Sequence, residues 1–328
     1  MASILLTGAT GFLGLALARR LAASDQAFRA LLREQSDVSE LAKLSAHCEI
    51  VYGDLNDPNS LLEACAGIDT IIHVAALVSY QSSDRDRLLL VNGEGTANLV
   101  NMALEAGVER LIHLSSVAVL NRVSGGPVIT LEDRWPAERP NSSYAESKFA
   151  AEREVWRGQA EGLSVAVLYP STMLGVGDWT GQNTSSFWRI ATQERHFYPE
   201  GTAGFVDLRD VVDATLFVLG RNINGDRFLL NGANMSWREL LARVARSIRV
   251  SPPTRRMPAW QSALLWPLEG LRARITGSKA FLTKETHRKV QANYHYDGSH
   301  YVKESGHPYR EVSKTIEEIG IAFLRQSA

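Results

Sequence analysis

The chain has 328 residues, enough to bury a large core and to form either one large α/β domain or a nucleotide domain with a smaller lobe. Hydrophobic residues make up 45 % and charged residues 22 %, which excludes a disordered or fibrous chain. The net charge of −1 is unevenly distributed, because residues 236–290 hold 12 Lys/Arg and three acidic residues. This basic segment indicates solvated helix faces, with an anionic substrate or a membrane surface as the alternatives.

The amino terminus and the cysteines bear on location. Residues 1–6 lead directly into a glycine loop and leave no room for a cleavable signal peptide, so the sequence predicts a cytoplasmic protein. No segment approaches the roughly 18 uninterrupted apolar residues that a membrane-spanning helix needs. Cys48 and Cys65 lack CxxC spacing and are expected to be reduced thiols in the core.

Short apolar segments alternate with helical segments along the first half of the chain. Strands are expected at 3–6, 28–32, 49–52, 70–74, 110–114 and 164–169, with helices at about 12–21, 60–66, 88–105 and 143–159. This alternation predicts an α/β fold with a parallel, doubly wound sheet. Ligands of such sheets bind at the carboxyl ends of the strands, near the point where strand order reverses.

A glycine loop, Thr-Gly-Ala-Thr-Gly-Phe-Leu-Gly at residues 7–14, follows the first strand. Its first glycine permits the turn, the second lets the backbone approach a pyrophosphate, and the third lets the helix pack on the sheet. Between a strand and a helix, this loop predicts dinucleotide binding. The candidate cofactor-binding residues of the loop are Gly8, Thr10, Gly11, Phe12, Leu13 and Gly14.

Arg33 and Glu34 follow the second strand, where the ribose of a bound dinucleotide is read. A guanidinium suits the 2′-phosphate of NADP(H), whereas a carboxylate suits the ribose hydroxyls of NAD(H). Arg33 therefore favours NADP(H), and NAD(H) is the alternative if Glu34 holds the ribose.

Residues after the third and fourth strands extend this predicted cofactor site. Asp54, followed by Leu55, is expected within reach of the adenine edge or, alternatively, as a helix cap. Ala75 and Ala76 are small enough to let the cofactor lie close to the backbone.

Tyr144 and Lys148 are one helical turn apart. Tyr144 follows the last glycine of the loop by 130 residues. Residues four apart share a helix face, so the phenol and the ammonium can act on one substrate. A free tyrosine titrates at about pH 10, and a nearby cation favours the phenolate. Lys148 is therefore expected to lower the pKa of Tyr144 towards useful acid/base strength.

Ser115 and Ser116 end the fifth strand. Ser116 precedes Tyr144 by 28 residues. A hydroxyl at this strand end can hold a carbonyl oxygen of a substrate. The spacing alone does not choose between the two serines, and a serine that only satisfies loop backbone is the alternative.

These motifs together resemble the extended short-chain dehydrogenase/reductase family, within the NAD-dependent epimerase/dehydratase superfamily. The glycine loop, the strand end His-Val-Ala-Ala, the paired serines, the Tyr-x-x-x-Lys spacing and residues 206–211 carry a resemblance that covers nearly the whole chain. It implies a Rossmann-type domain and hydride transfer between a nicotinamide and a substrate carbon. It further implies Ser116, Tyr144 and Lys148 as catalytic residues, with Ser115, Tyr144 and Lys148 also on the cofactor side.

The residues after the sixth strand indicate a branch of this family. Sugar-nucleotide epimerases usually carry Arg-Tyr-Phe-Asn here, and this chain has Tyr169 at the Arg position and Thr172 at the Asn position. Together with Pro170, these departures are more similar to dihydroflavonol reductases and 3β-hydroxysteroid dehydrogenases. The comparison implies that Pro170 lies by the nicotinamide.

Two discontinuous lobes are expected: residues 1–170, completed by roughly 205–232, as the cofactor domain, and residues 171–204 with 233–328 as the substrate lobe. Aromatic side chains between 179 and 205 suit an apolar pocket wall, although several are expected in the core. They are Trp179, Phe187, Trp188, Phe197, Tyr198 and Phe205. The apolar stretch 258–277 is expected to be a pocket lid or core, with packing between subunits or on a membrane surface as the alternatives.

The sequence thus favours an NADPH-dependent reductase, or the reverse alcohol dehydrogenase, acting on a largely apolar small molecule. One alternative is a nucleotide-sugar epimerase or dehydratase with tightly bound NAD, and another is a non-catalytic NADP(H)-binding regulator. No nucleic acid or metal is expected as a partner. The resemblance adds a homodimer as an option, because family members commonly dimerise through two surface helices.

Overall fold

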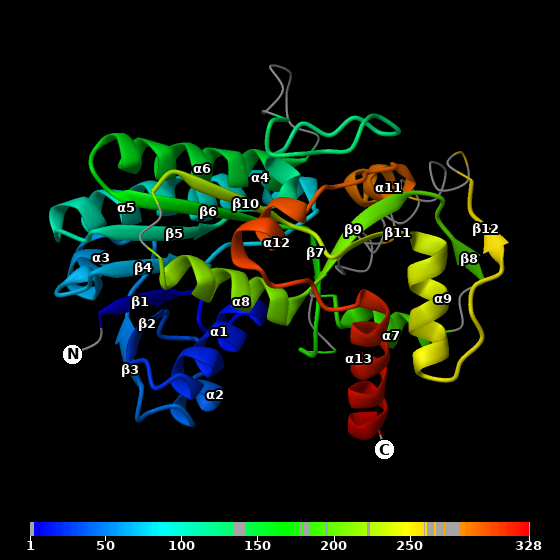
Figure 1. Ribbon diagram of the computed structural model, residues 1–328, viewed down its shortest axis with the longest axis horizontal. Helices are drawn as coiled ribbons and strands as arrows, with labels where there is room; N and C mark the ends of the chain where they lie inside the picture. Colours follow the sequence, from blue (N-terminus) through cyan, green and yellow to red (C-terminus); the bar gives the residue numbers. More distant parts are fainter. Residues whose placement is uncertain are drawn as a thin grey trace.

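The computed structural model describes residues 3–133, 142–177, 179, 184–193, 196–221, 224–258, 260, 266, 272 and 283–327. A seven-stranded parallel sheet forms its larger part (Figure 1). From one edge to the other the strands are β10 (Asp226–Leu230), β6 (Ser164–Pro170), β5 (Arg110–Leu114), β4 (Thr70–His73), β1 (Ile4–Thr7), β2 (Phe28–Leu32) and β3 (Cys48–Tyr52). Strand order reverses between β1 and β4, which confirms the predicted doubly wound sheet.

Helices cover both faces of this sheet, as parallel strands buried on both sides require (Figure 1). One face carries α1 (Phe12–Ala23), α2 (Ser39–Ala42), α8 (Leu208–Leu219) and α12 (Ser299–Ser305). The other face carries α3 (Pro58–Cys65), α5 (Gly95–Glu105) and α6 (Ser143–Ala160). The two hydrophobic cores lie between these helices and the sheet.

The helix expected at 88–105 is interrupted. It consists of α4 (Arg85–Leu88), a π-helical stretch at Leu89–Glu94, and α5. The wider turn places buried Asn92 so that its side chain accepts from the Leu77 N–H and donates to the Leu77 carbonyl and the Ser147 hydroxyl. The interruption therefore ties the loop after β4 to α6, a long-range pairing that apolar periodicity does not reveal.

The smaller lobe lies beside the large sheet, on the right in Figure 1. A three-stranded sheet contains β11 (Ala233–Ser236), β9 (Thr202–Asp207) and β7 (Thr172–Leu174), and a two-stranded sheet contains β12 (Arg255–Arg256) and β8 (Phe197–Tyr198). Its helices are α7 (Ser186–Ala191), α9 (Trp237–Ser247), α11 (Lys284–Gln291) and α13 (Val312–Ser327). Of residues 205–232, the first three lie in this smaller sheet as the end of β9, whereas α8 and β10 return to the large sheet.

The apolar stretch expected at 258–277 lies outside the described residues, apart from Pro258, Trp260, Trp266 and Arg272. Among the helices that the structure describes, none has both the length and the apolar character needed to cross a membrane. Cys48 and Cys65 are buried free thiols, as expected.

Candidate active site

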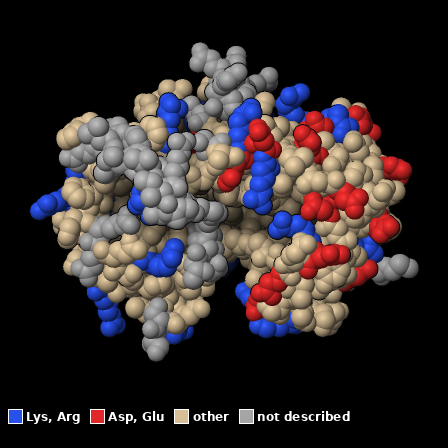
Figure 2. All heavy atoms as spheres, turned by 180° about the vertical axis from the view of Figure 1, so that it is seen from behind, with Lys and Arg blue, Asp and Glu red and all other residues tan. Residues whose placement is uncertain are grey.

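A largely apolar cleft of about 2820 Å³ lies between the carboxyl edge of the large sheet and the smaller lobe. Figure 2 shows the molecule from behind, with a hollow between its two halves. The predicted site residues on the wall of the cleft are Thr10, Gly11, Phe12, Ala76, Ser115, Ser116, Tyr144 and Pro170. Residues far apart in the sequence therefore meet at one edge of the sheet, where the strand order predicted a ligand site.

The glycine loop fits a dinucleotide for two geometric reasons. Gly8 has φ +73°, and a Cβ there would lie 2.7 Å from the Ala75 backbone nitrogen. A Cβ on Gly14 would lie 2.0 Å from the Gly8 carbonyl oxygen. Gly11, at the N-terminus of α1, caps the helix without a side chain, so the first-turn N–H groups beside the cleft suit a pyrophosphate.

Several predicted cofactor residues lie behind the wall instead of on it. Leu13 and Leu55 are buried in the two hydrophobic cores, and Ala75 packs its backbone against Gly8. The carboxylate of Asp54 accepts from the Asn56 N–H within a turn. The capping alternative for Asp54 is wrong, because Asp57 is the N-cap of α3.

Arg33 is exposed at the end of β2 and is not among the residues that line the cleft. The wall between α1 and α2 is formed instead by Arg19, Asp37, Ser39 and Glu40, with an ion pair between Arg19 and Glu40. The sequence did not single out these four residues, because their approach depends on how α2 packs beside α1.

Tyr144 lies in the first turn of α6, where the Ser142 hydroxyl caps the helix by accepting from the Ala145 N–H at 3.0 Å. Burial and the neighbouring Tyr80 raise the pKa of Tyr144 well above its usual value, and a hydrogen bond with Ser116 opposes this shift. The phenol is therefore protonated at neutral pH in this structure. Ser116 itself caps a short 3₁₀ turn by accepting from the Ala118 N–H at 3.1 Å.

Lys148 lies one turn after Tyr144, is 2 % exposed, and donates to the Leu114 carbonyl at 2.7 Å. Burial lowers its pKa to about 8, while the charge of Glu152 acts in the opposite direction. The expectation that Lys148 lowers the pKa of Tyr144 is not met here. The pKa of Tyr144 is raised because burial outweighs every other influence on it.

The two serines that the sequence left unresolved have different partners. The Ser115 hydroxyl donates to Glu152 at 2.7 Å, and Glu152 also accepts from Tyr169 at 2.6 Å and from the Trp156 indole at 3.1 Å. The Ser115 hydroxyl is thus engaged by Glu152, whereas the Ser116 side chain lowers the pKa of Tyr144 and so faces it. This geometry favours Ser116 as the substrate-facing hydroxyl.

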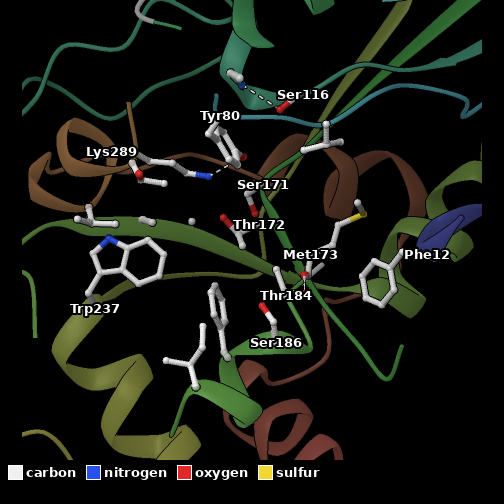
Figure 3. A pocket seen from close by; sticks show the side chains of 18 of the residues that line it. Phe12, Tyr80, Ser116, Ser171, Thr172, Met173, Thr184, Ser186, Trp237 and Lys289 are labelled. Carbon is white, nitrogen blue, oxygen red and sulfur yellow. Dashed lines mark hydrogen bonds between the residues drawn. The ribbon is translucent and has the colours of Figure 1, made fainter. Parts of the chain in front are cut away.

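Two further cleft residues, beside Tyr144, were not predicted from the sequence. The Lys289 ammonium on α11 donates to the Tyr80 hydroxyl at 3.2 Å, and the Tyr80 ring packs edge-on to Tyr144 with 6.0 Å between centroids. Figure 3 shows Lys289 pointing towards Tyr80 beside Ser171 and Thr172. Neither residue belongs to a motif, so no sequence signal marked them.

The aromatic residues expected around 179–205 divide between cleft and core. Phe187 and Phe197 line the cleft, together with Trp237 of α9. Trp188 and Phe205 are fully buried in the core of the smaller lobe, and Trp179 packs edge-on to Phe323. Three or more metal-ligating side chains do not cluster anywhere within the described residues.

A glycine loop at a helix N-terminus, beside Ser, Tyr and Lys at one edge of a doubly wound sheet, defines a nucleotide-dependent oxidoreductase. The model of the NAD-dependent epimerase/dehydratase family matches residues 4–230. The chain belongs to this family, and it is an NAD(P)-dependent oxidoreductase with the expected Rossmann-like fold.

Relatives at the level of sequence and structure agree with this assignment. Sterol demethylase protein B of Methylococcus capsulatus is 34 % identical over 261 residues, covering 76 % of this chain and 77 % of the relative. A Synechocystis protein with the provisional name dihydroflavonol 4-reductase is 29 % identical, covering 95 % and 92 %. The crystal structure of gox2253 superposes with a TM-score of 0.84 and 31 % identity, covering 100 % of this chain and 99 % of the other.

Proposed function

We propose that the protein is an NADPH-dependent carbonyl reductase, or the reverse alcohol dehydrogenase, of a largely apolar small molecule. The observation that carries the proposal is the placement of Ser116 and Tyr144 on the wall of the same largely apolar cleft as the N-terminus of α1. The proposal assigns cofactor binding to residues 1–170 with about 205–232, and substrate binding to residues 171–204 and 233–328.

A bound nicotinamide supplies the hydride for such a reduction. The Ser116 hydroxyl donates a hydrogen bond to the substrate oxygen, and Tyr144 transfers its phenolic proton to that oxygen as the carbonyl becomes an alcohol. The raised pKa of Tyr144 suits this direction, because it keeps the proton on the phenol until negative charge develops on the substrate. Lys148 holds a positive charge one turn away and is assigned to the nicotinamide ribose.

The surroundings of Tyr169 and Thr172 support an apolar substrate over a nucleotide sugar. The Tyr169 hydroxyl donates to Glu152 and the tyrosine is 2 % exposed, so it offers no cation to a diphosphate. Thr172 lines the cleft beside apolar Met173 and Phe187. The names of the relatives, a sterol demethylase protein and a dihydroflavonol reductase, support a substrate of the same kind.

The preference for NADP(H) rests on Arg33, exposed where β2 ends. A guanidinium at this strand end suits a 2′-phosphate. Michaelis constants measured for NADPH and NADH in parallel test the preference, and a lower constant for NADH contradicts it.

The proton-donor assignment is tested with Tyr144→Phe, using a panel of aldehydes and ketones and monitoring NADPH oxidation. Loss of the phenolic proton is expected to lower turnover by about 10²- to 10⁴-fold. Binding of NADPH, followed by its fluorescence, is expected to change little. Tyr52→Phe is the matched control, because Tyr52 is 54 % exposed and lies away from the cleft wall. Unchanged turnover of Tyr144→Phe refutes the assignment.

A further inference from the structure

Helix α11 brings a cation from the smaller lobe to the reacting end of the cleft. The Lys289 ammonium lies 4.9 Å from the centre of the Tyr80 ring and donates to its hydroxyl. Tyr80 in turn packs against Tyr144. The ammonium is thus separated from the proposed proton donor by one aromatic ring, and all three side chains line or adjoin the same cleft (Figure 3).

The charge of Lys289 has no carboxylate counter-ion among the residues that the structure describes; its interactions there are with Tyr80 alone. Glu285, one turn earlier on α11, is directed elsewhere, because its Oε1 accepts from the Ser143 N–H at the start of α6. Burial raises the pKa of Glu285, and the hydrogen bond from Ser143 opposes this shift. A cation on a largely apolar wall without a counter-ion is poised to bind an anion.

The charges around Lys289 point the same way. On the substrate side, Arg122, Arg272 and Arg288 line the cleft, and Glu285 is the acidic residue of that part of the wall among the described residues. Figure 2 shows acidic side chains gathered over the half of the molecule that holds the large sheet, while basic ones predominate on the smaller lobe. Within the described part of residues 236–290, basic side chains lie on α9, β12 and α11 of the smaller lobe.

We propose that the substrate carries a carboxylate, which the Lys289 ammonium and the Tyr80 hydroxyl bind beside the carbonyl that Tyr144 protonates. The inference rests on the proposed reductase function and names its substrate class. The Tyr80 oxygen accepts from Lys289 and keeps its own O–H to donate, so the pair offers charge-assisted hydrogen bonds to one oxyanion. The one ammonium of this pair matches the single charge of a carboxylate.

Paired substrates test this subsite: benzoylformate, benzoylacetate and benzoylpropionate, each against its methyl ester, with NADPH oxidation as the readout. At least one acid is expected to show a lower KM than its ester. Lys289→Met is expected to raise KM for that acid by about 10- to 100-fold, the loss of one charge-assisted hydrogen bond, and to leave KM for the ester nearly unchanged. Lys289→Arg is expected to retain the preference for the acid.

Lys284→Met is the matched control, because Lys284 is exposed on the same helix and is absent from the cleft wall. It is expected to leave both constants unchanged, and circular dichroism verifies that each variant is folded. Equal KM values for acids and esters in the unmodified protein overturn the inference. So does an equal effect of Lys289→Met on both members of each pair.

Calorimetric titration of the NADP⁺-saturated protein with benzoylpropionate provides a readout that does not depend on turnover. Binding that Lys289→Met abolishes supports the subsite even if no ketone is reduced, in which case the reductase assignment alone fails. Turnover of esters and ketones without any Lys289-dependent binding of acids overturns the subsite alone. Inorganic phosphate serves as the competing anion. If phosphate binds the subsite more tightly than benzoylpropionate does, the choice of a carboxylate is overturned.

Discussion

Substitution of Gly14 by alanine tests whether the glycine loop needs its close packing. The new Cβ would lie 2.0 Å from the Gly8 carbonyl oxygen, 2.7 Å from the Gly8 carbonyl carbon and 2.9 Å from the Ala9 Cα, all backbone atoms. Because real Cβ contacts essentially never fall under 3.0 Å, the shortest of these must open by about 1 Å. The start of α1 therefore has to move away from the turn at Gly8.

A displacement of about 1 Å takes a hydrogen bond from the loop N–H groups to a pyrophosphate beyond its normal length of about 2.7–3.2 Å. Losing one bond to a charged group costs about 1.5–3 kcal/mol, so NADPH is expected to bind about 10- to 100-fold more weakly. Overpacking should also destabilise the fold by about 1–3 kcal/mol.

The assays are fluorescence titration with NADPH and thermal unfolding of the cofactor-free protein. Gly220→Ala is the matched control, because φ there is −75° and its new Cβ would meet the Leu216 oxygen at an ordinary 3.4 Å. Wild-type affinity together with an unchanged unfolding temperature in Gly14→Ala would refute the reasoning.

Three further predictions address charge, cofactor choice and stability. The Lys148 ammonium loses its proton as pH rises through its pKa of about 8, and the charge of Glu152 raises that pKa. Glu152→Gln should therefore move the alkaline limb of the kcat/KM profile to lower pH. An alkaline limb that stays in place contradicts this prediction. Arg33→Ala should raise KM for NADPH by about 10- to 100-fold and leave KM for NADH nearly constant, whereas equal changes would argue against a 2′-phosphate contact. Trp188 is fully buried and donates to Ser247 at 3.0 Å, so Trp188→Ala should cost about 3–5 kcal/mol in urea unfolding, and a loss below about 1 kcal/mol would contradict its place in the core.

Local patterns were enough to predict much of the large sheet. Strands expected at 28–32 and 110–114 have those bounds in the structure, and the helix expected from 143 begins there. Each depends on apolar periodicity or capping over a few consecutive residues, which backbone geometry converts directly into structure. The π-helical stretch at Leu89–Glu94 was not predicted from the sequence. It goes with hydrogen bonds from the Asn92 side chain to Leu77 and Ser147, which are remote in the chain and leave no local pattern.

The candidate site divides in the same way. By itself the sequence determined the glycine loop, the spacing of Tyr144 and Lys148, and hence a nucleotide-linked redox enzyme, because these features are set by residues within one turn or one loop. Only the tertiary structure separated Ser115 from Ser116, through the reach of Glu152. It also brought Lys289 to Tyr80 across 209 residues of sequence, since contacts between lobes depend on how whole elements pack and leave no local pattern in the chain.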